Sequence, residues 1–284
     1  PRDAFVWRLR FAGLGDSPLV QRWIEAPAEA QSNAEILQRQ LFVRNQFKAE
    51  QVEADVFLAN LRQGEELLWR LDRTDGGAGT LFASLERRQE DASLSSGQWF
   101  TESRLSPNGQ QDRWIVPEDG AYRLVIQPEL FASATYTLAM SSGGSLAMPV
   151  AGASQRDIGS PFGAPRDGGA RQHHGVDIFA PKSTPVVAVI DGRVRTGISN
   201  LGGKHVWLSE GRFSLVSPRY YYAHLDEFAV EAGASVKAGD VLGYVGNTGN
   251  ARNTPPHLHF GIYTSGGPVD PEPFIQQRPV LLKN

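Results

Sequence analysis

The sequence predicts a mostly β protein that consists of two antiparallel domains. Three observations lead to this prediction: short segments in which apolar and polar residues alternate, 30 glycines and 18 prolines, and a small polar stretch near the middle of the chain. Alternation with a period of two puts apolar side chains on one face of a strand, as in half-buried antiparallel sheets. A length of 284 residues is sufficient for two domains.

The first half contains most of the clear alternation. Residues 4–11 place four large apolar side chains on one face of a strand, so we expect a strand there. Residues 29–51 mix Leu, Gln and Arg in a way that suits an amphipathic helix or a long irregular arm. Further strands are expected at 55–61, 66–72, 80–86, 121–127 and 135–140.

The polar, glycine-containing stretch SSGGS begins at residue 141 and predicts a linker near 141–147. We therefore expect an N-terminal antiparallel β-sandwich domain at 1–147, with the helix or arm, and a second β domain at 148–284. Glycine-bounded strand segments of the second domain are expected at 184–198, 204–211, 219–225 and 236–246.

Composition excludes several classes of protein. A net charge of −3 and a pI near 6.1 argue against a nucleic-acid-binding surface. No run of 18 apolar residues occurs, so we expect no membrane span. The absence of cysteine excludes disulfides and thiolate metal sites. Residue 1 is Pro rather than Met, which is compatible with a processed chain and a removed signal peptide.

All six histidines lie in the second half, so we expect the chemistry there; they are His173, His174, His205, His224, His257 and His259. In the stretch PHLHF, His257 and His259 would project from one face of a strand while Leu258 and Phe260 enter the core. Taken alone, such a pair is more often a surface feature than a site.

Two further elements change that interpretation. His173 and Asp177 are four residues apart in HHGVDIF and would share a face, whereas His174 would point away. A catalytic zinc site needs three protein ligands and one open position. His173, Asp177 and one histidine of the HxH pair would supply three ligands. The other histidine and His224 would act as general base and transition-state donor.

Four segments carry a family resemblance: HHGVDIFAPKSTPVVAVIDGRV, YYYAHL, VKAGDVLGYVGNTGN and PPHLHFGIY. Over about 148–284 the chain resembles the lysostaphin/autolysin-type zinc metallo-endopeptidases, which hydrolyse peptidoglycan. The resemblance implies that His173, Asp177 and His259 bind Zn²⁺, and that His224 and His257 are the catalytic pair. It also implies a small antiparallel β-barrel or sandwich in a bacterial protein of the periplasm or one that is secreted to the cell envelope.

The resemblance places the substrate groove between loops near Phe179, 200–204 and 247–254. Candidate substrate-binding residues are Phe179, Tyr222, Asn247 and Thr248. We expect peptidoglycan peptide as the substrate, with D-Ala–diaminopimelate cross-links favoured over glycine bridges by analogy with periplasmic members. The rate is expected to fall below about pH 6, as imidazoles protonate. Oligomeric state is not predicted.

The first domain, over about 50–140, faintly resembles the jelly-roll modules attached to secreted bacterial proteases. Trp99, Phe100 and Trp114 are candidates for glycan binding there, although aromatic residues of a sandwich are more often core. Some family members carry an inhibitory Asn upstream of the catalytic domain, and Asn33 and Asn45 are candidates by position alone.

Two rival functions keep part of this pattern. A non-catalytic cell-wall-binding module or activator of other hydrolases would typically lack zinc ligands, whereas all five functional positions are filled here. A lipoyl- or biotinyl-type carrier is suggested by VKAGDVLGYVG, but a carrier presents a modifiable Lys at a hairpin tip and has no use for HxH.

Overall fold

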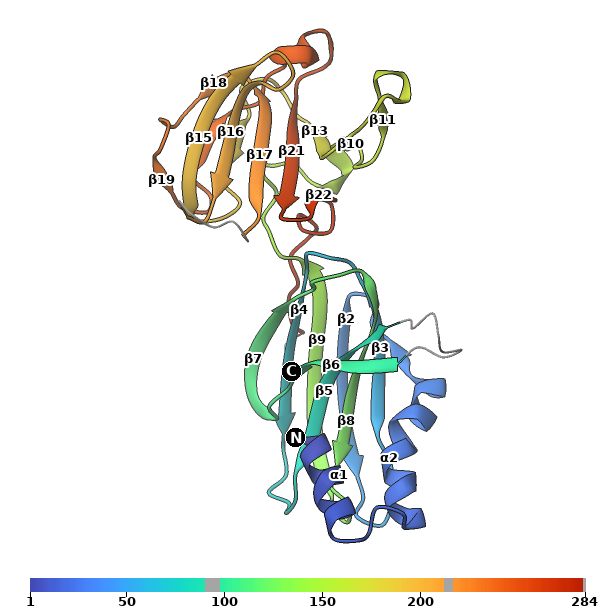
Figure 1. The fold of residues 1–284 in the computed structure, drawn as a ribbon. Helices are drawn as coiled ribbons and strands as arrows, with labels where there is room; N and C mark the ends of the chain where they lie inside the picture. Colours follow the sequence, from blue (N-terminus) through green and yellow to red (C-terminus); the bar gives the residue numbers. More distant parts are fainter. Residues whose placement is uncertain (90–97, 212–216, 283–284) are drawn as a thin grey trace. The chain divides into compact units, whose positions relative to one another are not determined.

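The structure, a computed structural model, describes residues 1–89, 98–211 and 217–282. The chain forms two units: unit 1 comprises residues 1–143 and 279–284, and unit 2 comprises 144–278 (Figure 1). The expected linker starts later than its composition suggests. Residues 141–144 complete strand β9 (Ala134–Gly144), and Ser141 is buried, with its Oγ accepting a hydrogen bond from the Val280 backbone amide.

Unit 1 is a sandwich of two β-sheets. The five-stranded sheet has the order β1 (Glu35–Ile36), β3 (Asp55–Leu61), β8 (Gly120–Pro128), β5 (Leu81–Gln89), β6 (Gln98–Arg104). The four-stranded sheet has the order β2 (Gln40–Phe47), β9, β4 (Glu65–Arg73), β7 (Asn108–Ile115). The orders 3-8-5-6 and 2-9-4-7 are those of a jelly roll, which confirms the predicted fold class of this unit.

The core of unit 1 lies between these sheets. Alternate residues of facing strands supply it, including Leu124 and Ile126 from β8 and Tyr136 and Leu138 from β9. Two helices, α1 (Arg2–Phe11) and α2 (Pro18–Ala30), cover the outer face of the five-stranded sheet, where Phe82 of β5 packs against them. Among the described residues, no helix is both long and apolar enough to span a bilayer.

The strand expected at residues 4–11 is wrong, because this segment is helix α1. Phe5 and Leu9 lie one helical turn apart and pack with Trp23 and Phe82. Trp7 and Phe11, which the alternating pattern assigned to the same face, are 63% and 82% exposed. In so short a segment, residues that share one face of a helix can also share one face of a strand, as Phe5 and Leu9 do, so the pattern does not distinguish the two structures.

The prediction of an amphipathic helix or a long irregular arm over 29–51 is also wrong. Helix α2 ends at Ala30, followed by a 3₁₀ turn (Gln31–Asn33), β1 and β2. Strand β2 alternates, with Leu41 and Phe47 buried in the sandwich core and Val43 packed against it. The start of α2 has a readable signal: Ser17 accepts a hydrogen bond from the Val20 amide and Pro18 follows it.

The aromatic candidates of unit 1 have three different environments. Trp114 packs against the core, with its ring edge-to-face on Tyr122 at 5.5 Å. Trp99 is half-buried under the Arg123 guanidinium, which lies 4.5 Å from the Trp99 ring centre, and Phe100 is 45% exposed.

The two candidates for an inhibitory Asn both lie in unit 1. Asn45 donates a hydrogen bond to Asp55 at 2.8 Å, and Asn33 ends the 3₁₀ turn.

Unit 2 is a second sandwich. Its eight-stranded sheet has the order β10 (Ile158–Ser160), β13 (Val176–Phe179), β21 (His257–Thr264), β17 (Arg219–Leu225), β16 (Gly203–Ser209), β15 (Gly192–Ser199), β19 (Ser235–Val236), with β22 (Gly267–Val269) beside β21. A three-stranded sheet has the order β14 (Pro185–Val187), β20 (Val241–Tyr244), β18 (Glu227–Phe228). Among the described residues, β10 and β19 at the two ends of the larger sheet do not pair with each other, so the fold is a sandwich and not a closed barrel.

The core of unit 2 lies between its two sheets. Val176, Leu258 and Phe260 of the large sheet and Val186 and Leu242 of the small sheet are all 0% exposed. The opposite face of the large sheet is therefore free to carry polar side chains. Hairpin β11–β12 (Pro165–Arg166 and Arg171–Gln172) and the 3₁₀ turns Gln155–Asp157, Asp167–Gly169 and Gly249–Asn253 complete the unit.

Candidate metal centre

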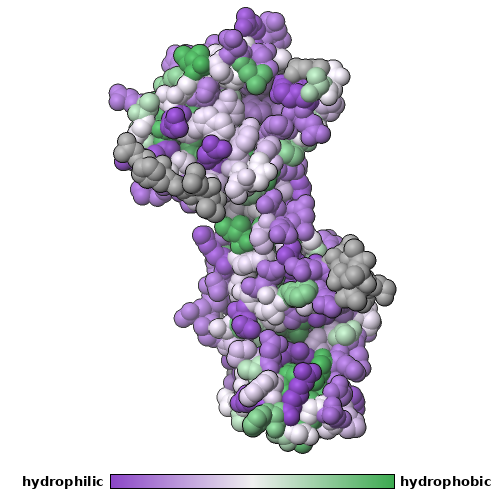
Figure 2. Space-filling view, viewed as in Figure 1, coloured by the Kyte–Doolittle hydropathy of each residue, from purple (hydrophilic) through white to green (hydrophobic). Residues whose placement is uncertain are grey.

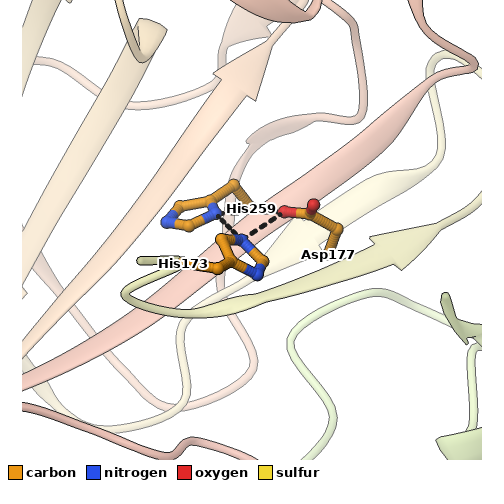
Figure 3. A group of neighbouring side chains, drawn as sticks. All are labelled: His173, Asp177 and His259. Atoms are coloured by element: carbon orange, nitrogen blue, oxygen red, sulfur yellow. Dashed lines mark hydrogen bonds and ion pairs between the residues drawn. The ribbon is translucent and has the colours of Figure 1, made fainter. Parts of the chain in front are cut away.

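Three potential metal ligands meet on that polar face (Figure 3). Strand β13 pairs with β21 so that Asp177 lies opposite His259, and His173 lies in the segment just before β13. The His173 Nε2 atom is 3.0 Å from Asp177 Oδ1 and 2.9 Å from His259 Nδ1, and the last two atoms are 3.0 Å apart. One atom of each side chain thus points to a common centre.

The chemistry of these atoms suits a cation. His173 Nδ1 lies 2.8 Å from the Pro161 carbonyl oxygen, which can only accept, so Nδ1 carries the proton and Nε2 presents a lone pair. A tetrahedral ion with bonds of 2.0–2.1 Å needs ligand atoms about 3.3 Å apart, close to the observed spacing. The donor set of two imidazoles and one carboxylate fits zinc.

Asp177 uses its two oxygens differently. Oδ1 faces the histidines, whereas Oδ2 accepts a hydrogen bond of 2.7 Å from Arg166 Nη2, which also donates to Ser160 Oγ at 2.6 Å. Burial alone would raise the pKa of Asp177, but its hydrogen bonds to His173 and His259 outweigh burial and lower the pKa well below its ordinary value. The carboxyl is therefore ionised and has one oxygen directed at the centre.

His257 lies beside these three residues. It is opposite Phe179 in the β13–β21 pair, and Leu258 and Phe260 enter the core as the alternation predicted. Its Nδ1 lies 2.8 Å from the Pro255 carbonyl oxygen and its Nε2 is 3.9 Å from Asp177 Oδ1. The carbonyl again holds the proton on Nδ1, which leaves Nε2 as the acceptor at the site.

His224 reaches the site through an unusual backbone conformation. Tyr220 and Tyr222 point into the core, so alternation would send His224 inward too; instead its φ is +65° and Leu225 takes the buried position. Such φ values are strained for residues other than glycine and often occur at functional sites. His224 Nδ1 donates to the Thr248 carbonyl oxygen at 2.9 Å. Burial, with repulsion from His257 and His259, lowers the pKa of His224 to about 4.

A cavity of about 510 Å³ opens over this centre. Its lining includes His224, the three candidate ligands and His257, together with residues of the expected loops at 200–204 and 247–254. Phe179 lines it as predicted. His174 also lines it, so the expectation that His174 points away is wrong, although it does not join the ligand cluster.

Three of the candidate substrate-binding residues have other surroundings. Tyr222 is 0% exposed and its hydroxyl accepts a hydrogen bond from the Val189 amide, so the prediction for Tyr222 is wrong. Asn247 and Thr248 are not among the described residues that line the cavity. Thr248 instead supports His224 and accepts a hydrogen bond from the Lys204 amide.

Sequence reasoning missed several residues of the cavity, chiefly Arg166, Arg171, Tyr221 and Tyr263. For Tyr221 a signal existed: in the run YYYAHL, successive residues point to opposite faces. The sequence does not show whether Tyr221 or its two tyrosine neighbours face the core. For Arg166 no local signal existed, since it approaches Asp177 from the β11–β12 hairpin.

The sequence pattern of peptidase family M23 matches residues 171–271, a span that includes all five of these histidine and aspartate positions. Unit 2 carries a peptidase family M23 domain. This agrees with the resemblance to lysostaphin-type enzymes found from the motifs.

Relatives of the M23 domain include peptidases of bacteria. The chain is 38% identical over 113 residues to the glycyl-glycine endopeptidase ALE-1 of Staphylococcus capitis, covering 37% of this chain and 29% of that protein. It is 31% identical over 214 residues to an uncharacterized metalloprotease of Haemophilus influenzae, covering 72% of this chain and 41% of that protein. The chain thus spans less than half the length of these relatives.

Among solved structures, the catalytic domain of lysostaphin from Staphylococcus simulans is 37% identical, with 41% of this chain and 89% of that chain covered and a TM-score of 0.36.

Proposed function

We propose that this protein is a zinc-dependent endopeptidase that hydrolyses peptide cross-links of bacterial peptidoglycan. The observation that carries the proposal is the convergence of His173 Nε2, Asp177 Oδ1 and His259 Nδ1 within 3.0 Å of one another under an open cavity. These three atoms would hold the zinc ion. The M23 domain and its lysostaphin-type relatives support both the reaction and the substrate.

His173, Asp177 and His259 would hold a zinc ion, whose Lewis acidity would polarise a carbonyl and activate water. The side chains of the site manage protons and orientation. His224 and His257 each have Nδ1–H bound to a backbone carbonyl, so Nε2 is the atom that accepts a proton from the attacking water. The same atom, once protonated, stabilises developing negative charge and returns the proton to the leaving amine.

The walls of the cavity orient the substrate. Phe179 and Tyr221 contribute aromatic surface, with the Phe179 ring beside His257 and the Tyr221 ring beside His259. Because peptidoglycan lies outside the cytoplasmic membrane, the proposal places this protein in the bacterial cell envelope, either periplasmic or secreted.

Zinc content and hydrolysis of purified peptidoglycan, measured on the same preparations, test this function. His259→Ala removes a ligand and should lose zinc and activity together. His224→Asn and His257→Ala should keep zinc and lose activity by about 10²–10⁴-fold. Asn suits position 224 because it tolerates a positive φ.

His205→Gln is the control, because His205 bonds the Gly203 carbonyl and is not part of the cluster. It should retain zinc. A wild-type protein that binds no zinc, or that binds zinc and releases no fragments from peptidoglycan, would contradict the proposed function. The second outcome would favour a non-catalytic wall-binding module.

A further inference from the structure

The polar face of the large sheet in unit 2 continues beyond the candidate metal centre. Val194, Val206, Leu208 and Tyr222 are buried in the core, so their neighbours along β15, β16 and β17 project from the opposite face, where the centre lies. Arg195 lies opposite Trp207, and Trp207 lies opposite Tyr221. These strands run side by side with β21 (Figure 1).

Five side chains on this face form what we call the aromatic–arginine strip: Arg195, Trp207, Arg219, Tyr221 and Tyr263. The Trp207 ring is 4.4 Å from that of Tyr221 and 5.1 Å from that of Tyr263. The Arg219 guanidinium lies over Trp207, 5.5 Å from the ring centre. The rings are half-buried, and Arg195 and Arg219 are exposed.

The strip is continuous with the candidate metal centre. Tyr221 and Tyr263 line the same cavity as the ligand cluster, and the Tyr221 ring is 6.0 Å from the His259 ring. A chain bound at the centre therefore meets the two tyrosines first and Trp207 with its arginines next.

The charge of this sheet is one-sided. In its eight strands, all of which the structure describes, Asp177 is the one acidic residue, and it belongs to the ligand cluster. The same strands contain four basic residues: Arg193, Arg195, Lys204 and Arg219. A net charge of −3 for the whole chain makes this local excess of positive charge more informative, because it does not follow from composition.

We propose that the aromatic–arginine strip binds a carboxylate-bearing peptide segment of the substrate, adjacent to the bond presented to the candidate metal centre. The inference rests on the proposed peptidase function and specifies its substrate chemistry. Directly cross-linked stem peptides carry free carboxylates near the cross-link, whereas a glycine bridge is uncharged. The strip therefore selects directly cross-linked substrates.

The parts of the strip contribute differently. Arg195 and Arg219 pair with carboxylates and, being exposed, change affinity by about threefold each. Trp207 and the tyrosines offer flat apolar surface to the peptide backbone and aliphatic side chains, which does not depend on charge. If the arginines contribute, the affinity for the peptide should therefore fall when its carboxylates are removed or when the salt concentration is raised.

The test measures the dissociation constants of two synthetic peptides. One is a directly cross-linked stem peptide and the other is the same peptide with every free carboxylate amidated. His257→Ala serves as a common background because it slows cleavage enough for the binding of both peptides to be measured. We expect the background protein to bind the acidic peptide about tenfold more tightly at low salt, and expect Arg195→Gln combined with Arg219→Gln to remove this preference.

Arg156→Gln in the same background is the matched control, since Arg156 is exposed in unit 2 and lies outside the sheet; it should leave the preference unchanged. Equal affinity for the two peptides, no binding of either, or a double variant that behaves like the control would overturn the proposal.

Hydrolysis of both peptides by the protein with His257 intact keeps the two claims distinguishable. Selective binding without hydrolysis would overturn the proposed function but would support the proposed role of the aromatic–arginine strip in binding. Hydrolysis with no preference for the acidic peptide would overturn only the proposed role of the aromatic–arginine strip. When both claims are correct, the double arginine variant raises KM for the acidic peptide and leaves kcat unchanged.

Discussion

At the candidate metal centre, backbone carbonyls determine which nitrogen carries the proton in three of the four histidines. The Nδ1–H group of His173 donates to the Pro161 carbonyl oxygen. His257 donates in the same way to Pro255, and His224 to Thr248. The Nε2 atoms are consequently lone-pair donors directed at the site. His259 is the exception, since its Nδ1 faces the centre.

Arg166 provides the first prediction at this scale. It binds the Asp177 oxygen that faces away from the histidines, so Arg166→Ala frees the carboxylate to rotate and should weaken zinc affinity by about 10–100-fold. Arg166→Lys should recover part of the loss, because an ammonium bonds Asp177 without reproducing the planar geometry. Competition with a chelator of known affinity measures this, and affinity in Arg166→Ala equal to that in Arg156→Ala would contradict it.

His224 provides a prediction about pH. Its pKa is 6.5 in the unfolded chain and about 4 in the fold, so only the unfolded chain takes up a proton between these values. The contribution of His224 to the free energy of unfolding is therefore fully present above pH 6.5, and it is lost as the pH falls toward 4. Between pH 7.5 and 5 the loss from this group is about 2 kcal/mol.

Urea unfolding of the metal-free protein at both pH values measures this dependence. His224→Asn keeps a donor toward Thr248 without titrating, and its unfolding free energy should change less with pH by that amount. An identical pH dependence in the two proteins would show that His224 is not the group responsible.

The residue scale is also where sequence reasoning worked best and where its limit is clear. The HxH motif on strand β21 and the HxxxD motif that runs into strand β13 place side chains by local geometry, and His173, Asp177 and His259 from these motifs converge. The prediction for Tyr222 was wrong because the pattern of three successive tyrosines does not show which of them face the core. His224 points to the cavity only because of its positive φ, which no pattern of residue types encodes.

At the scale of elements, the pairing of β13 with β21 builds the centre. Gly175 precedes β13, and a Cβ at this position would lie 2.4 Å from the Phe260 carbonyl oxygen and 2.8 Å from His259 Cε1. The close approach of the two segments therefore depends on the absence of a side chain.

Gly175→Ala should push β13 and His259 apart, which lowers the free energy of unfolding by about 1–3 kcal/mol and weakens zinc binding. Gly266→Ala is the control, because a Cβ there would meet Thr264 Oγ1 at an ordinary 3.7 Å. Denaturant unfolding and zinc titration of both variants provide the comparison. Equal stability of the two variants would refute the close-packing argument.

Elements were predictable where local and tertiary preferences agree. Strands β3, β4 and β8 occupy nearly the expected ranges. Helix α1 and strand β2 were assigned to the wrong class because packing on Phe82 and on the sandwich core overrides weak local patterns.

At the scale of the whole molecule, each unit has a hydrophobic core of its own. On the face that Figure 2 shows, hydrophobic residues are scattered among hydrophilic ones. The histidine distribution indicated the division, since unit 1 contains none. The two units meet at Gly143–Gly144, within the stretch 141–147 that resembles a linker, and strand β9 extends to Gly144.

Differential scanning calorimetry should therefore show two transitions for the full chain. Zinc binds only folded unit 2 under our proposal, so zinc at 100 times its dissociation constant adds about 2.7 kcal/mol and raises one transition by about 5–10 °C. The other transition should not move when a chelator is added. A chelator effect on both transitions, or on neither, would contradict this assignment.

The central claim is that His173, Asp177 and His259 form one zinc site. X-ray absorption spectroscopy of the full chain, loaded with one equivalent of zinc, tests it most directly. We predict a first shell that contains two imidazole nitrogens and a carboxylate oxygen at about 2.0–2.1 Å, and loss of one imidazole in His259→Ala. A wild-type spectrum without imidazole scattering, or one that His259→Ala leaves unchanged, would contradict the claim.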